Sequence, residues 1–214
     1  MNGTASNPIH LPGRVVVFDY GEVISFSPTP ENRRDLLEVA GIDPTNAEVF
    51  WEAYEAGRQA LDQGTLSIAD YWAGIAAATG ASWSPAEVHS IWAIDFVGWL
   101  SVNPGTAAVL EDLAAGGTRL ALLSNAGRDF SSYFRNGSFG PLFETVVVSA
   151  EVLVVKPDAA IYRHTLDTLG ITPAEMVFID NKAENIAGAE ALGITGHVFT
   201  SADGLRSFLE ELAA

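Results

Sequence analysis

The sequence predicts an α/β protein: a parallel β-sheet covered by helices on both faces, with a block of helices inserted after the first strand. Several short runs are continuously apolar, which is typical of strands buried on both faces. In the C-terminal half these runs alternate with helical segments, and this alternation indicates a parallel sheet. The long stretch between the first run and the second has helical patterns and no comparable strand signal.

The strands and the helices between them can be placed along the chain. The predicted strands are the apolar runs 15–18, 120–123, 145–148, 176–179 and, more weakly, 197–199. The predicted core helices carry a proline at the start or a glycine stop at the end, and they are 104–115, 157–169 and 183–192. Strand and helix therefore alternate through the second half of the sequence.

The inserted block is rich in Ala, Glu and Trp. Its predicted helices follow Ser or Pro start signals, and they are 31–40, 45–62, 67–79 and 84–100. We therefore expect a core domain of residues 14–28 and 101–214, a helical cap domain of residues 29–100 and a flexible N-terminal segment of residues 1–13. A helical block at this place is a candidate lid, and its plainer interpretation is a small helical subdomain.

Composition limits the possible functions. The chain has 214 residues, 27 acidic and 11 basic side chains and a formal charge of −16, which opposes binding to nucleic acid or an anionic membrane. The absence of cysteine excludes disulfides, thiolate metal sites and cysteine nucleophiles. Residues 1–13 lack the pattern of a signal peptide, and no run reaches the roughly 20 apolar residues of a membrane span. We expect a soluble cytoplasmic protein, monomeric or homodimeric, with a small-molecule partner.

Polar groups follow four of the predicted strands. Asp19 follows the first strand, Ser124 and Asn125 follow the second, Lys156 comes after the third, and Asp180 ends the fourth. Ligands in open α/β sheets bind at the carboxyl ends of the strands, so we expect these side chains to lie close together. Each one alone has a plain explanation as a turn, cap or surface residue. Together and in this order they indicate a functional site.

Around these positions the chain resembles the haloacid dehalogenase (HAD) superfamily, from residue 14 to residue 212. The resemblance rests on four motifs, which are Val17-Phe18-Asp19-Tyr20-Gly21-Glu22-Val23-Ile24, Leu123-Ser124-Asn125, Lys156-Pro157-Asp158 with Ile161-Tyr162, and Phe178-Ile179-Asp180-Asn181 with Glu184-Asn185. It implies a Rossmann-like core with an α-helical cap. In the cap, Gly64-Thr65-Leu66-Ser67 with Tyr71-Trp72 is similar, more weakly, to bacterial sugar-phosphate phosphatases.

The resemblance implies a nucleophile and a metal site. Asp19 would attack phosphorus and hold the group as an aspartyl-phosphate, which divides one difficult displacement into two easier ones. Mg²⁺ would be bound by Asp19, the backbone carbonyl of Gly21 and Asp180, because this ion prefers oxygen ligands. The partner implied is a small phosphorylated metabolite.

The resemblance also implies groups that hold the phosphoryl oxygens. Lys156 would supply a fixed positive charge, and Ser124 a hydroxyl, both as catalytic and substrate-binding residues. Asn125 would bind substrate through the backbone amides around it and Ala126, at a strand-to-helix turn of the kind that holds anions. Asn181 and Glu184 would order water on the cation, or would simply be polar residues at a helix start.

Gly21 departs from the common pattern of the superfamily. Many of its phosphatases have a second Asp there, which acts as acid and base, and a positioned group of this kind contributes about 10² to 10⁴ in rate. Glu22 is one residue further along, and we expect its side chain to face elsewhere. Three alternatives stay open: a Mg²⁺-dependent phosphatase of the sugar-phosphate branch, a 2-haloacid dehalogenase-type hydrolase, and a catalytically weak ligand-binding protein. Retention of Asp180 favours the phosphatase over the dehalogenase.

Some residues beside the first motif or in the helical block are candidates for contact with the substrate. They are Phe26, Trp51, Tyr54 and Arg58, the last of which could bind a sugar hydroxyl or a second anionic group. Aromatic residues at helical spacing usually form a core, and this is their other interpretation. The tryptophans expected to pack between helices are Trp72, Trp83, Trp92 and Trp99. The histidines without ligand spacing are His89, His164 and His197.

Overall fold

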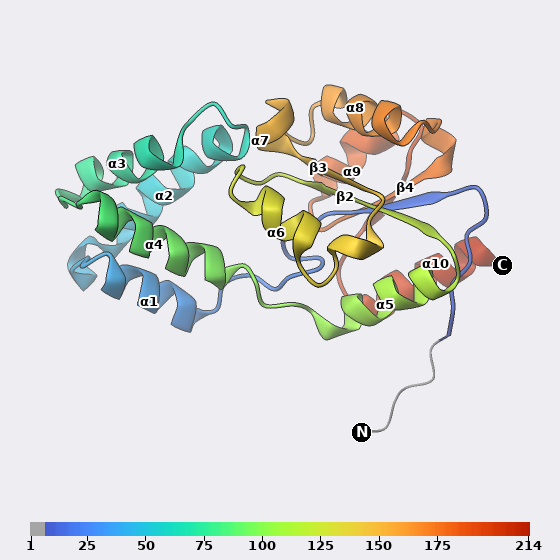
Figure 1. Cartoon of the computed structure of the whole chain (residues 1–214), viewed down its shortest axis with the longest axis horizontal. Coiled ribbons are helices and arrows are strands. Elements are labelled where there is room, and N and C mark those ends of the chain that lie inside the picture. The colour runs from blue at the N-terminus through green and yellow to red at the C-terminus, as the bar shows by residue number, and fades with distance from the viewer. Residues whose placement is uncertain (1–6) are drawn as a thin grey trace, which may run out of the picture.

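The computed structural model describes residues 7–214 and shows a sheet flanked by helices, with a helical block at one end (Figure 1). Five parallel strands form one sheet in the order β3-β2-β1-β4-β5. The strands are β1 (Val15–Phe18), β2 (Arg119–Ser124), β3 (Thr145–Val148), β4 (Met176–Asp180) and β5 (Thr195–Val198). The predicted α/β fold with a parallel sheet is confirmed.

The first strand lies in the middle of the sheet, and this position assembles the polar groups. β1 pairs with β2 on one side and with β4 on the other. Because all strands are parallel, their carboxyl ends open at one edge of the sheet. Asp19, Ser124 and Asp180, which end or directly follow these three strands, therefore lie at the same edge.

Helices cover both faces of the sheet, which explains the continuously apolar strands. One face packs against α5 (Pro104–Ala115), α6 (Phe130–Asn136) and α10 (Ala202–Ala213), and the other against α8 (Ala159–Leu169) and α9 (Ala183–Glu190). In β1, Val16 and Phe18 belong to the first core, and Val15 and Val17 to the second. Short elements complete the core, namely α7 (Ser149–Val152) and the 3₁₀ segments Gly140–Leu142 and Pro173–Glu175.

The inserted block has a hydrophobic core of its own. Its helices are α1 (Pro30–Val39), α2 (Ala47–Asp62), α3 (Ile68–Thr79) and α4 (Pro85–Gly98), with a 3₁₀ segment Pro44–Asn46 before α2. Phe50, Trp72 and Ile75 are buried between them. Ser67 and Ser84 cap α3 and α4 by accepting hydrogen bonds from backbone amides in the first turn. In Figure 1 the block lies beside the edge of the sheet at which the strands end.

Several predicted boundaries were wrong for identifiable reasons. The helix predicted for 157–169 begins at Ala159, because Asp158 is its N-cap and its side chain accepts a hydrogen bond from the Ala160 amide. The last strand begins at Thr195, two residues before the predicted 197–199 run, and ends at Val198. The helices α6, α7 and α10 were not predicted. Of these, α10 carries a start signal, since Ser201 accepts a hydrogen bond from the Gly204 amide.

The prediction that residues 1–13 form a flexible segment does not hold for its second half. Residues 1–6 lie outside the described part of the chain. Ile9 and Leu11 are buried against the sheet core. The Ile9 amide donates to the Asp112 carbonyl at 3.0 Å, and the Leu11 amide donates to the Thr118 hydroxyl at 3.0 Å. The segment thus adds two apolar side chains to the core beside α5.

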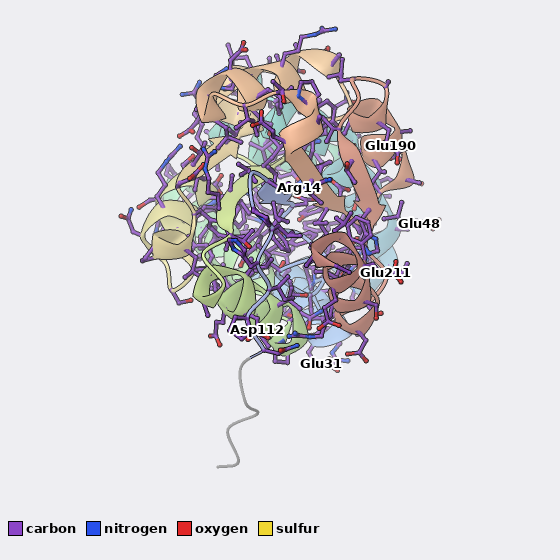
Figure 2. All side chains as sticks on the ribbon, turned by 90° about the vertical axis from the view of Figure 1, so that its right-hand side faces the viewer. Arg14, Glu31, Glu48, Asp112, Glu190 and Glu211 are labelled. Atoms are coloured by element: carbon purple, nitrogen blue, oxygen red, sulfur yellow. The ribbon has the colours of Figure 1, made fainter. Side chains whose placement is uncertain are left out.

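Much of the acidic excess lies at the surface. Glu31, Glu48, Glu190 and Glu211, which are labelled in Figure 2, are all exposed. They come from four different helices, which are α1, α2, α9 and α10. Within residues 7–214, no helix combines the length and the apolar character needed to cross a membrane.

Replacing Gly64 by Ala is expected to destabilise the protein more than the same change at Gly80. Both glycines have a left-handed backbone conformation, with φ of 76° at Gly64 and 73° at Gly80. A Cβ at Gly64 would lie 2.4 Å from the Ala150 carbonyl oxygen, whereas a Cβ at Gly80 meets nothing within 4 Å. We expect Gly80→Ala to cost about 1 kcal/mol through backbone strain alone, and Gly64→Ala at least about 2 kcal/mol. Urea unfolding of the two variants measures the difference, and equal losses would show that the helical block does not press on α7 here.

Candidate active site

A single cavity of ≈ 620 Å³ lies between the carboxyl ends of the strands and the inserted helices. From the sheet side it is lined by Asp19, Gly21, Ser124, Lys156 and Asn181. From the helical side it is lined by Arg33, Trp51, Tyr54, Arg58, Asp62 and Trp99. The cavity therefore joins the polar groups at the strand ends to a wall made by the inserted block, and its volume suits a small molecule.

A buried ammonium group links two carboxylates at the floor of this cavity. The Lys156 Nζ lies 2.9 Å from the Asp19 Oδ1 and 2.7 Å from the Asp180 Oδ2. It also donates to the Leu123 carbonyl at 3.1 Å, and its side chain is 1% exposed. Residues from β1, β4 and the loop after β3 are thus brought together as the sequence predicted. Two carboxylates this close repel each other unless a cation lies between them, and Lys156 fills that position.

Asp180 is held from all sides. Its Oδ1 accepts from the Lys182 amide at 2.8 Å and from the Asn185 Nδ2 at 3.0 Å, and its Oδ2 accepts from Lys156 and, at 3.0 Å, from Asn185. The residue is fully buried. A carboxylate oxygen has about two acceptor positions, so both oxygens are filled. Asp180 in this arrangement orients Lys156, and it has no acceptor position open for a cation.

Asn185 contributes to the site although sequence reasoning gave it no role. Its side chain is buried, and its amide group bonds both oxygens of Asp180. The signal for this contact was its place in the first turn of α9, five residues after Asp180, where a helix returns toward the strand it follows. The sequence instead predicted that Asn181 and Glu184 order water on the cation. Both line the cavity, and the Asn181 Nδ2 donates to the Glu22 Oε2 at 2.5 Å.

The pKa of Asp19 is raised to about 6, mainly because the carboxyl group is buried. The charge of Asp180 raises it further, whereas the charge of Lys156 and a hydrogen bond from the Tyr20 amide to the Asp19 Oδ1 lower it. The second oxygen, Oδ2, accepts no hydrogen bond from the rest of residues 7–214. Asp19 therefore presents one free oxygen to the cavity and is ionised at neutral pH.

The loop after β2 provides a hydroxyl and a structural clamp. Ser124 is buried, lines the cavity and makes no side-chain hydrogen bond with the described residues. The Asn125 side chain instead joins two loops, since its Oδ1 accepts from the Lys156 amide at 2.8 Å and its Nδ2 donates to the Lys156 carbonyl at 3.0 Å. The Ala126 amide, which we expected to hold a phosphoryl oxygen, donates to the Ser149 hydroxyl at 2.9 Å. Only Ser124 and the Asn125 amide of this turn thus stay candidates for the oxygens.

Gly21 and Trp99 lie against each other in the cavity wall. A Cβ on Gly21 would come 3.7 Å from the Trp99 ring, so a larger residue there would face an aromatic surface. Trp99, which we expected to pack between helices, lines the cavity, and its Nε1 is buried without a hydrogen-bond partner among the described residues. Glu22 has a φ of 61° and its carboxylate accepts from Ser27 and Asn181, at the edge of the site.

The inserted helices supply a buried charge cluster. Arg58 lies 3.2 Å from Asp62 and 3.7 Å from Asp95, and the Tyr54 hydroxyl donates to Asp95 at 2.6 Å. Arg58 and Tyr54 line the cavity as predicted, but Arg58 is paired with carboxylates rather than free to bind a second anionic group. Phe26 is 46% exposed and does not line the cavity, because it lies on the segment that leads to the helical block.

A family model described as haloacid dehalogenase-like hydrolase matches residues 9–193. The chain therefore belongs to the haloacid dehalogenase-like hydrolase family, as its four motifs predicted. A sesquiterpene phosphatase of Aspergillus oryzae is 26% identical over 92% of this chain and 94% of its own length. An (S)-2-haloacid dehalogenase of a Pseudomonas strain is 30% identical over 95 residues, which are 44% of this chain and 42% of that protein.

Solved structures of the same family share the fold. A HAD family enzyme of Bacteroides thetaiotaomicron, in complex with magnesium and inorganic phosphate, superposes with a TM-score of 0.69 at 20% identity, over 87% of this chain and 94% of that one. The L-2-haloacid dehalogenase of Xanthobacter autotrophicus superposes with a TM-score of 0.64 at 18% identity, over 94% and 84% of the two chains. At these identities the likeness establishes the fold alone.

Proposed function

We propose that this hydrolase is a Mg²⁺-dependent phosphatase that acts on a small phosphomonoester through an aspartyl-phosphate on Asp19. The observation that carries the proposal is the Asp19–Lys156 pair in the cavity, which is also lined by Ser124, with the Asp19 Oδ2 and the Ser124 hydroxyl both free of hydrogen bonds from residues 7–214. A nucleophilic carboxylate, a fixed ammonium and a hydroxyl donor are the groups that phosphoryl transfer requires.

The residues have distinct roles in the proposed reaction. The Asp19 Oδ2 attacks phosphorus, and the alcohol leaves. Lys156 keeps Asp19 ionised and offsets the charge of the phosphoryl oxygens, while Ser124 donates a hydrogen bond to one of them. Asp180 and Asn185 hold Lys156 in position without touching the substrate. Water then attacks the phosphorus, and Asp19 is released as a carboxylate.

The donor atoms around Asp19 suit a cation with one change from the predicted ligands. The Gly21 carbonyl accepts no hydrogen bond from residues 7–214 and is open, and the Asp19 carboxylate lines the same cavity. The oxygens of Asp180 are filled, whereas Asn181 lines the cavity and brings an amide oxygen. We therefore assign Mg²⁺ to Asp19, Gly21 and Asn181. When bound, Mg²⁺ would neutralise charge on the phosphoryl group.

One relative supports a phosphomonoester as the substrate, and the identity of the alcohol that is released stays open. The relative that aligns over nearly its whole length has the name of a sesquiterpene phosphatase. Apolar and aromatic side chains also line the cavity, and they include Leu36, Trp51, Ile94, Trp99 and Phe130. A sugar phosphate remains our proposal from sequence, and a phosphate ester with an apolar alcohol suits this lining as well.

A dehalogenase is the second candidate. Gly21 favours it, because a halide leaves without a proton and needs no acid at that position. Release of chloride from a 2-chloro acid in the presence of EDTA would establish it, and neither chloride nor phosphate release would indicate a protein that only binds its ligand.

Removal of the divalent cation is expected to abolish phosphate release. Turnover of 4-nitrophenyl phosphate is measured with Mg²⁺, after EDTA and after Mg²⁺ is restored, and turnover that survives EDTA would contradict the metal requirement. Asn181→Asp adds a charged ligand, so calorimetric titration should show Mg²⁺ affinity raised about tenfold. An unchanged affinity would remove Asn181 from the metal site and return the assignment to Asp180.

A further inference from the structure

The helical wall of the cavity contains a carboxyl group that the reaction described above does not use. Asp62 is the last residue of α2, lines the same cavity as Asp19, and its side chain is 17% exposed. Its Oδ1 accepts from the Arg58 Nη2 at 3.2 Å. Its Oδ2 accepts no hydrogen bond from any other described residue and is therefore available to a ligand in the cavity.

Contacts of the backbone fix Asp62 over the loop after β2. The Asp62 carbonyl accepts from the Ser149 hydroxyl, which in turn accepts from the Ala126 amide at 2.9 Å. The next residue, Gln63, donates from its Nε2 to the Leu153 carbonyl at 3.1 Å. Ala126 lies two residues after Ser124, so one hydroxyl joins the end of α2 to the turn that carries the phosphate-binding group.

The charges around Asp62 favour a bound proton. Arg58 is the one cation in the cluster, and it faces two buried carboxyl groups, Asp62 from α2 and Asp95 from α4. Asp95 also accepts from the Tyr54 hydroxyl, which stabilises its ionised form. Asp62 has no second donor on its side chain, so of the two carboxyl groups it is the one that takes up a proton more readily.

The net effect of the surroundings is to raise the pKa of Asp62 to about 6. Burial is the main cause, Arg58 and Lys182 lower the pKa, and Asp129 and Asp95 raise it. The most effective acid–base groups have a pKa near the working pH, and a carboxyl group with a pKa near 6 meets this condition.

We propose that Asp62 is the general acid and base of the reaction and takes the place of the acid that Gly21 lacks. This rests on the proposed phosphatase activity. As the Asp19 Oδ2–phosphorus bond forms and the phosphorus–oxygen bond to the alcohol breaks, the proton of Asp62 passes to the leaving oxygen. In the second step the Asp62 carboxylate takes a proton from the attacking water as the water oxygen bonds to phosphorus and the Asp19 oxygen–phosphorus bond breaks. This releases inorganic phosphate and regenerates the Asp19 carboxylate and the protonated Asp62.

A pair of substrates with similar shapes tests this role. Phenyl phosphate has a leaving group with a pKa near 10, as for the Tyr side chain, and needs a proton, whereas 4-nitrophenyl phosphate leaves as a stable anion. For Asp62→Asn we expect kcat/KM to fall about 10²-fold or more with phenyl phosphate and less than about threefold with 4-nitrophenyl phosphate. The slope of log kcat/KM against leaving-group pKa should become steeper, and Asp62→Glu should recover part of the loss.

The matched control is Asp95→Asn, which alters the same Arg58 cluster at a carboxyl group that already accepts a hydrogen bond from Tyr54. This variant should lower kcat/KM by a similar factor with both substrates. If Asp62→Asn also lowers kcat/KM equally with both substrates, Asp62 only supports the cavity wall and the proposal is overturned, while the phosphatase activity stands. If the wild-type protein releases phosphate from neither ester, the proposed function itself fails.

Discussion

Replacing Asp19 by Asn is expected to lower kcat for 4-nitrophenyl phosphate by at least about 10⁴-fold and, at the same time, to stabilise the protein. The loss of activity follows because the amide cannot attack phosphorus, and removal of a nucleophile costs this much or more in enzymes that use one. The gain in stability follows because the ionised Asp19 is buried beside Asp180, and Lys156 is the one cation of residues 7–214 in contact with it.

The pH dependence of this stabilisation has a definite sign. The pKa of Asp19 rises from 3.8 to about 6 on folding, so the protonated group is compatible with the fold at low pH, and stability is lost as pH rises through about 6. Asp19→Asn should therefore match the wild type in stability below about pH 4 and exceed it by roughly 1–3 kcal/mol at pH 7. Urea unfolding in EDTA at both pH values measures this, and a variant that is less stable at pH 7 would show that the Lys156 pair outweighs the cost of burial.

Replacing Lys156 by Met is expected to have the largest effect on stability. The side chain is 1% exposed and touches both carboxylates, so an apolar residue of similar length leaves Asp19 and Asp180 buried together without a cation. Breaking a buried ion pair by removing one partner typically costs about 3–5 kcal/mol. We expect a loss of this size at pH 7, together with loss of phosphate release, because Asp19 would take up a proton.

Lys182 provides the matched control, because it is an exposed lysine at the same cavity. Lys182→Met should change the free energy of unfolding by less than about 0.5 kcal/mol, as surface substitutions usually do. In the double variant Asp19→Asn with Lys156→Met, only Asp180 stays charged, and much of the lost stability should return. If Lys156→Met is no less stable than Lys182→Met, the buried ammonium does not hold the two carboxylates together.

The sequence predicted the part of the site that the sheet itself determines. A continuously apolar run followed by Asp19 places that carboxylate at the carboxyl end of a buried strand, and the same reasoning placed Ser124 and Asp180. Because neighbouring parallel strands end at one edge, no knowledge of side-chain orientation was needed. Lys156 was placed by its motif, and the structure brings it to both carboxylates.

The rest depends on side-chain orientation and on packing between segments far apart in sequence. Asp180 could be placed at the site, but not the fact that Asn185 and Lys156 fill its oxygens. Asp62 ended a predicted helix and belonged to no motif. Its place in the cavity arises from the hydrogen bond between its carbonyl and the Ser149 hydroxyl, which lies 87 residues further along the chain. Trp99 looked like a packing residue because the predicted helix ran to residue 100, whereas α4 ends at Gly98 and Trp99 follows it in the cavity wall.

The central claim, that Asp19 is a nucleophile toward phosphorus, is tested most directly by trapping the covalent intermediate. The wild-type protein is mixed with Mg²⁺ and 4-nitrophenyl phosphate, quenched in acid within one turnover and digested for mass spectrometry. We predict a phosphoryl group on the peptide that contains Asp19, and none on that peptide in Asp19→Asn. Nitrophenol released in a full turnover with no phosphoryl group on Asp19 at any quench time, or with the group on another residue, would contradict the account.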